Sequence, residues 1–113
     1  MILKKEEQRR FSRLDFKNPL RYKIRGENKF ENALCENLSL GGLGFENEEF
    51  VPPSTPVTVE INIPYRTLKP LGRVVWSAPL PHSDKYRLGI EFLNLDPKDW
   101  AYLENYLQKE NAL

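Results

Sequence analysis

The stretch PVTVEINIP, Pro56 to Pro64, decides the fold class. Every second residue in it is apolar, and polar residues stand between them. The apolar positions are Val57, Val59, Ile61 and Ile63. Because side chains alternate between the two faces of a strand, this pattern predicts a β-strand with one buried face, ended by a proline on each side.

Similar alternation occurs on both sides of this stretch. The segment LRYKIRG, residues 20–26, precedes it, and Gly26-Glu27-Asn28 then supplies turn residues that predict a hairpin. The segments LGRVVWSAP, residues 71–79, and KYRLGIEFLNL, residues 85–95, follow it. Short strands separated by polar turns favour a closed or nearly closed antiparallel sheet, in a mainly β protein.

The C-terminal segment has the period of a helix instead. Asp96 is placed to act as N-cap, with Pro97 at the first helical position. The residues that follow form one apolar stripe, which is expected to cover the sheet. They are Trp100, Leu103, Tyr106 and Leu107.

Residues 1–18 are charged, lack a regular period and end at Asn18-Pro19, which disfavours helix continuation. They carry too little apolar surface to hold themselves against a core, so we expect a flexible N-terminal arm. Residues 19–113 would form the β-barrel and its helix, and the length of 113 residues matches one domain overall.

The charge balance limits the classes of binding partner that the chain is expected to have. The chain has 17 Lys and Arg against 16 Asp and Glu, a net charge of +1, which argues against charge-driven binding of a nucleic acid polymer or a membrane surface. There is no run of 18 apolar residues, so no membrane insertion is expected. The single cysteine, Cys35, excludes an intramolecular disulfide and favours a cytoplasmic location.

Nothing in the sequence predicts an enzyme, a bound metal or a cofactor. The one histidine, His82, neighbours Ser83 and Asp84, but side chains adjacent in a loop rarely converge on one substrate atom. We expect His82 to be exposed and Cys35 to be a packed thiol. Residues 41–44, GGLG, have neither P-loop nor dinucleotide spacing and predict a tight turn.

Two short clusters carry more information. Arg9 and Arg13 are four positions apart with Arg10 between them, and the segment ENLSLGGLGF follows later in the chain. Together they resemble the RxxxR and (D/N)xSxxG motifs of the PilZ domain, a bacterial cyclic di-GMP receptor family. The second motif reads Asn37-Leu38-Ser39-Leu40-Gly41-Gly42.

The resemblance extends over nearly the whole chain, through GRVVW and LGIEFLNLDPKDWAYLENYL. It implies a six-stranded antiparallel PilZ-type β-barrel with a C-terminal α-helix. It also implies a set of cyclic di-GMP-binding residues: Arg9, Arg10, Arg13, Asn37, Ser39, Gly42 and Trp76.

The roles of these residues follow from the resemblance and from their chemistry. Arg9 and Arg13 would grip phosphate or guanine through the planar guanidinium, with help from Arg10, while Phe11 anchors the arm. Asn37 and Ser39 would bind a guanine, and Gly42 would keep the turn tight.

The chemistry and strand position of Asn37 and Trp76 lead to two further expectations. Asn37 has one neutral acceptor where an aspartate would have two charged oxygens, so weaker binding is expected. Strand alternation puts Val74 and Trp76 on one face and Val75 on the other, and leaves open whether Trp76 contacts ligand or core.

We therefore expect a receptor and adaptor whose arm becomes ordered on nucleotide binding and which signals to an unidentified downstream protein. The alternative is a PilZ-like protein-interaction adaptor that does not bind nucleotide. A small RNA-binding barrel should show exposed aromatic residues interleaved with basic residues on its strands. In this chain acidic residues balance the basic ones, which argues against an RNA-binding barrel. The number of bound nucleotides and the formation of a homodimer stay open.

Overall fold

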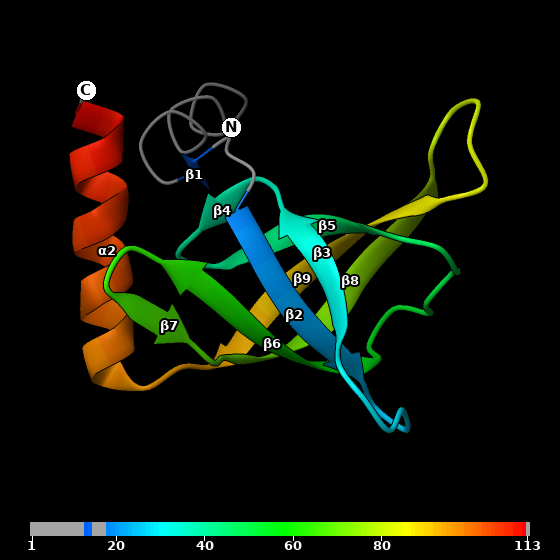
Figure 1. The fold of residues 1–113 in the computed structure, drawn as a ribbon, viewed down its shortest axis with the longest axis horizontal. Coiled ribbons are helices and arrows are strands. Elements are labelled where there is room, and N and C mark those ends of the chain that lie inside the picture. Colours follow the sequence, from blue (N-terminus) through cyan, green and yellow to red (C-terminus); the bar gives the residue numbers. More distant parts are fainter. Residues whose placement is uncertain (1–12, 15–17, 113) are drawn as a thin grey trace.

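The computed structural model describes residues 13–14 and 18–112 of the chain (Figure 1). Its strands are, in chain order, β1 (Arg13–Leu14), β2 (Asn18–Ile24), β3 (Glu31–Cys35), β4 (Leu38–Ser39), β5 (Gly42–Asn47), β6 (Pro56–Ile63), β7 (Arg66–Leu68), β8 (Leu71–Pro79) and β9 (Tyr86–Asn94). Helix α2 (Pro97–Ala112) follows them. The mainly β fold with one C-terminal helix, predicted from the alternating stretches, is confirmed.

Seven of the described strands form one curved antiparallel sheet in the order β3-β2-β6-β8-β9-β5, with β7 added to β6 (Figure 1). The two outer strands of this order, β3 and β5, meet at one isolated bridge between Glu36 and Gly44. Each of these residues donates its backbone N–H to the other's carbonyl, over 2.7 and 2.8 Å. The six-stranded path therefore curves round until its edges meet at one point.

The alternation read in the sequence sets the core. In β6 the four apolar side chains are buried, as predicted, and the same holds for Leu20 and Tyr22 of β2. The hairpin is confirmed: β2 pairs with β3, and Gly26 in the turn has a φ of 95°, which favours glycine. Burying one face of each strand while the other meets water is the usual solution for an antiparallel sheet.

Helix α2 begins where the sequence predicts. Asp96 Oδ1 accepts a hydrogen bond from the Lys98 backbone N–H over 2.8 Å, the contact of an N-cap. Leu103 and Leu107 are buried in the core, but Trp100 is 40% exposed. Placing Trp100 in the buried stripe was therefore wrong, because two leucines one turn apart already cover the sheet.

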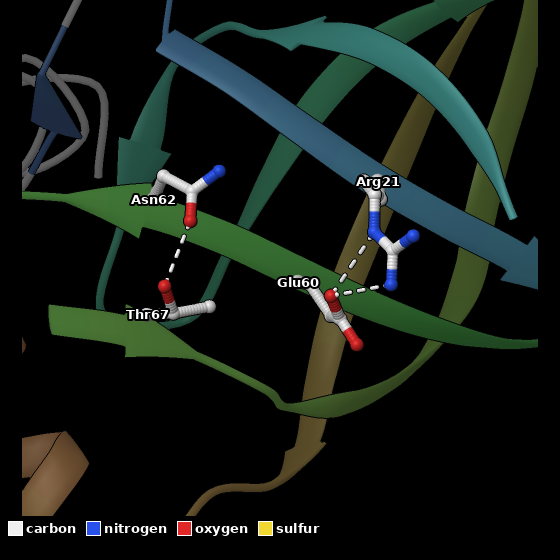
Figure 2. Close-up of polar contacts among 4 residues, drawn as sticks. All are labelled: Arg21, Glu60, Asn62 and Thr67. Atoms are coloured by element: carbon white, nitrogen blue, oxygen red, sulfur yellow. Dashed lines mark hydrogen bonds and ion pairs between the residues drawn. The ribbon is translucent and has the colours of Figure 1, made fainter.

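Polar pairs hold the outer face of β2, β6 and β7 (Figure 2). Arg21 donates to Glu60 Oε1 from Nε over 3.1 Å and from Nη2 over 2.9 Å. Thr67 Oγ1 donates to Asn62 Oδ1 over 2.8 Å. These contacts join β2 to β6 and β6 to β7, which are neighbouring strands in the sheet.

The N-terminal segment adds a strand that the sequence did not predict. Arg13–Leu14 pairs antiparallel with Leu38–Ser39, and this small sheet lies beside α2 (Figure 1). Two residues are too few to show a period, so only the partner strand defines β1. Among the described residues, no helix has both the length and the apolar character needed to span a bilayer.

Candidate functional site

The connection between β3 and β5 contains the second motif. Asn37 stands at its start with a φ of 55°, in the left-handed region that asparagine tolerates better than most residues. No hydrogen bond among the described residues engages its side-chain amide. The backbone conformation therefore favours asparagine at this position, and the amide is available to a ligand.

Ser39 holds the turn that follows. Its hydroxyl donates to the Gly42 carbonyl over 3.3 Å and accepts from the Gly41 N–H over 3.2 Å. A hydroxyl has one donor and two acceptor positions, so one acceptor position is left. Ser39 thus shapes the loop first, and one lone pair stays available to a ligand.

The last residue of the first motif, Arg13, meets the second motif through backbone pairing. In the pairing of β1 with β4, Arg13 stands opposite Ser39 and Leu14 opposite Leu38. The second arginine of RxxxR is thereby tied in register to the serine of the other motif. Arg9, Arg10 and Phe11 lie outside the described residues, as does the side chain of Arg13.

A hollow of about 420 Å³ lies beside this pairing. Asn37, Ser39 and residues 41–44 line one side, Val75 and Trp76 line the other, and residues 89–91 of β9 complete it. The sequence-predicted residues Asn37, Ser39, Gly42 and Trp76 therefore come together at one place.

Two of the glycines in this hollow are required by close contacts. A Cβ on Gly42 would lie 1.9 Å from the Ile90 carbonyl oxygen, and one on Gly89 would lie 2.4 Å from the Trp76 indole. Gly42 is the first residue of β5 and Gly44 lies within it, so reading GGLG as a turn was only partly right. These glycines let strands and indole approach without intervening side chains.

Trp76 reaches the hollow because of a β-bulge. Val74 pairs with Ile90 and Trp76 with Gly89, so Val75 is an extra residue in β8. Val74 is fully buried, whereas Val75 and Trp76 are both exposed, Trp76 to 46%. The prediction that Val74 and Trp76 share a face was wrong, because the bulge shifts the alternation by one and turns Trp76 outward.

Charged residues that the motifs do not include surround the site. Glu36, directly before Asn37, is the one buried acidic side chain among the described residues, and its Oε1 lies 3.2 Å from Arg87 Nε. Glu91 lines the hollow and pairs with Arg73, with 2.9 Å between Oε1 and Nε. Sequence reasoning missed these pairs, since their partners are far apart along the chain.

Cys35, two residues before Asn37, is a packed thiol. It is fully buried in β3, and burial, helped by the charge of Glu36, raises the pKa of its thiol to about 12. The thiolate is therefore absent at neutral pH, as expected of a packed thiol. His82 is exposed in the loop between β8 and β9, as predicted. Within the described ranges, no group of three or more potential ligands could hold a metal.

A larger hollow, of about 610 Å³, lies elsewhere, between β3 and the end of β5. Six glutamates line it, against two lysines. The glutamates are Glu27, Glu31, Glu36, Glu46, Glu48 and Glu49. This charge repels an anionic ligand, so size alone does not identify a nucleotide site, and the hollow beside Asn37 is the better candidate.

The comparisons with known proteins agree with the motifs. The family model of the PilZ domain matches residues 7–109. The chain belongs to the PilZ family. PilZ domains are binding and adaptor domains, typically for cyclic di-GMP. No curated protein matched the sequence significantly.

Solved structures of other PilZ proteins share this fold. The inhibitor of motility MotI/DgrA of Bacillus subtilis superposes with a TM-score of 0.78 at 17% identity, over 89% of this chain and 50% of its own. This PilZ chain thus spans about half the length of that protein. The PilZ domain of YcgR from Escherichia coli, solved with c-di-GMP, gives 0.63 at 18% identity, over 85% of this chain and 84% of its own.

A third structure, the PilZ domain of CeSA from a cellulose-synthesizing bacterium, gives a TM-score of 0.60 at 14% identity. The alignment covers 89% of this chain and 98% of that domain. At such identities the likeness concerns the fold, and the assignment to the family rests on the match over residues 7–109.

Proposed function

We propose that this PilZ domain is a receptor for cyclic di-GMP and acts as an adaptor toward a downstream protein. One observation carries the proposal: Arg13 is paired in register with Ser39, beside a hollow lined by Asn37, Gly42 and Trp76. Arg13 of the first motif and Ser39 of the second are thus paired, although some 25 residues separate them in the sequence, which supports one shared site.

The arginines supply the recognition of phosphate and guanine. A guanidinium presents paired donors in a plane, which suits a phosphate or the acceptor edge of guanine, and it can stack on a base. We assign this role to Arg9 and Arg13, with Arg10 as an additional positive charge. The near-neutral chain gives no general attraction for anions, so these three local charges matter most.

The loop and the indole supply the rest of the site. The unengaged amide of Asn37 and the remaining lone pair of Ser39 face a guanine, while Gly42 keeps the floor free of side chains. Trp76 stacks on a base, because it is half-exposed and lies against Gly89. No catalytic residue and no cofactor take part.

The output is a conformational switch. Binding draws the guanidinium groups of Arg9 and Arg13 toward the hollow and holds residues 4–16 more tightly against the barrel. Because β1 lies beside α2, the change reaches the surface formed by the arm and this helix, where a downstream protein would read it. We place this switch in the cytoplasm, where cyclic di-GMP is available.

Isothermal titration with cyclic di-GMP tests the proposal. The wild-type chain should bind, and Arg9→Ala and Arg13→Ala should each weaken binding about ten- to a hundredfold, the worth of a hydrogen bond to a charged group. Arg25→Ala is the control, since Arg25 is exposed in the turn directly after β2 and does not line the hollow.

Two results would contradict the proposal. Absence of binding by the folded wild-type chain would favour the PilZ-like adaptor that does not bind nucleotide. Equal losses in Arg25→Ala and Arg13→Ala would show that the arginines act only through net charge.

A further inference from the structure

Glu91 is a polar residue of the hollow that belongs to neither motif. It lies on β9, where it stands opposite Gly42 of β5 on one side and Arg73 of β8 on the other. Gly42 brings no side chain to this place. Among the described residues that line the hollow with Asn37 and Trp76, Glu91 is the acidic one.

Arg73 fixes one half of this carboxylate. Its Nε donates to Glu91 Oε1 over 2.9 Å, and both side chains are about half-exposed. Among the described residues this is the contact that the carboxylate makes, and it leaves Oε2 available to a ligand. The pairing also offsets the negative charge, which would otherwise repel a ligand phosphate.

The donor edge of guanine suits such a group. Guanine presents N1–H and N2–H, two donors side by side, and an ionised carboxylate offers acceptors only. The Asn37 amide offers one acceptor and one donor. That amide suits adenine, which presents an acceptor at N1 beside a donor at N6. Asn37 alone therefore does not select guanine over adenine.

We propose that Glu91, oriented by Arg73, is the residue that makes this site specific for guanine, by accepting hydrogen bonds from the donor edge of the base. This rests on the proposed function, that the hollow binds a cyclic dinucleotide. Glu91 supplies the carboxylate that position 37 lacks in this chain.

The test is titration of the Glu91→Gln variant with cyclic di-GMP and with cyclic di-AMP. The glutamine oxygen still accepts from Arg73, while its amide places a donor toward the base. Affinity for cyclic di-GMP should fall about ten- to a hundredfold. Affinity for cyclic di-AMP should stay equal or rise, so the ratio of the two affinities should shrink.

Glu60→Gln is the matched control. Glu60 accepts from Arg21 over the same distance, 2.9 Å, on an exposed strand face outside the hollow (Figure 2). This variant should keep both affinities and their ratio. Thermal unfolding of the two variants checks that each remains folded, because the Glu91 side chain is 45% exposed and that of Glu60 is 21% exposed.

The outcomes separate this inference from the proposed function. If the wild-type chain binds neither nucleotide, the proposed function fails, and the role of Glu91 fails with it. If the wild-type chain binds cyclic di-GMP and Glu91→Gln keeps the same affinity ratio, only the role of Glu91 is overturned. A parallel rise of both affinities would also overturn it, because removal of charge, and not of base recognition, would then explain the effect.

Discussion

Asn37 combines two demands on one residue. Its left-handed backbone, with φ at 55°, disfavours β-branched side chains. Asn37 also lines the hollow, and its side-chain amide has no hydrogen-bond partner among the described residues. The family pattern admits aspartate or asparagine, and both tolerate this conformation. The residue can therefore be exchanged to change ligand affinity with little effect on the loop.

Asn37→Asp should tighten the binding of cyclic di-GMP. A hydrogen bond to a charged acceptor is worth about 1 kcal/mol more than one to a neutral acceptor, so the dissociation constant should fall about five- to tenfold. Isothermal titration measures this directly. An unchanged affinity, with the thermal stability preserved, would show that residue 37 does not contact the base.

Trp76 is the residue whose role the structure changes most. Trp76→Ala should weaken nucleotide binding by about 1–3 kcal/mol, the worth of stacking one base on an aromatic ring. The free energy of unfolding of this variant should change little, because the indole of Trp76 is half-exposed. Trp100→Ala is a close control, since Trp100 is similarly exposed but lies on α2 and does not line the hollow. Equal effects of the two substitutions on affinity would argue against stacking.

At the scale of elements, the close approach of β5 to β9 depends on Gly42. A methyl group on Gly42 would overlap the Ile90 carbonyl, whereas a Cβ on Gly41 would lie 4.0 Å from Ser39 Oγ. Gly42→Ala should therefore lower the free energy of unfolding by about 1–3 kcal/mol. Gly41→Ala should change it by less than about 0.5 kcal/mol. Urea unfolding of the two variants decides this, and equal stabilities would contradict the packing described.

The same elements show what sequence can predict. Period-two alternation predicted β2, β6 and β9, because a half-buried strand must show it. The two-residue pairing of β1 with β4 has no period of its own, so it could not be predicted. The bulge after Val74 was equally hidden, since an extra residue in β8 is defined only by its partner Gly89.

The candidate site divides in the same way. Asn37, Ser39, Gly42 and Trp76 could be named from their motifs and are found together. The orientation of Trp76 and the presence of Glu91 in the hollow could not, because both depend on how β8 and β9 are aligned. Local patterns identified the candidate residues, and the strand register determines what those residues face.

At the scale of the whole molecule, the buried thiol of Cys35 makes stability depend on pH. Its pKa is raised from 9.0 to about 12, so the folded state holds the proton more tightly than the unfolded chain. This contribution is complete below pH 9 and is lost as the pH rises toward 12.

Denaturant unfolding of the wild-type chain and of Cys35→Ala, from about pH 8 to pH 10.5, measures this contribution. Above pH 9 the wild-type free energy of unfolding should fall more steeply, by up to about 1.4 kcal/mol per pH unit relative to the variant. Parallel curves would show that the thiol ionises as easily in the folded protein as in the unfolded one.

We expect the arginine motif to close on the hollow beside Ser39 when cyclic di-GMP binds. Hydrogen exchange with and without saturating cyclic di-GMP, followed by mass spectrometry across residues 4–16 and 36–44, tests it most directly. We predict slower exchange of both segments with nucleotide, and no such change in Arg13→Ala at the same concentration. Equal exchange of residues 4–16 with and without nucleotide would contradict the account.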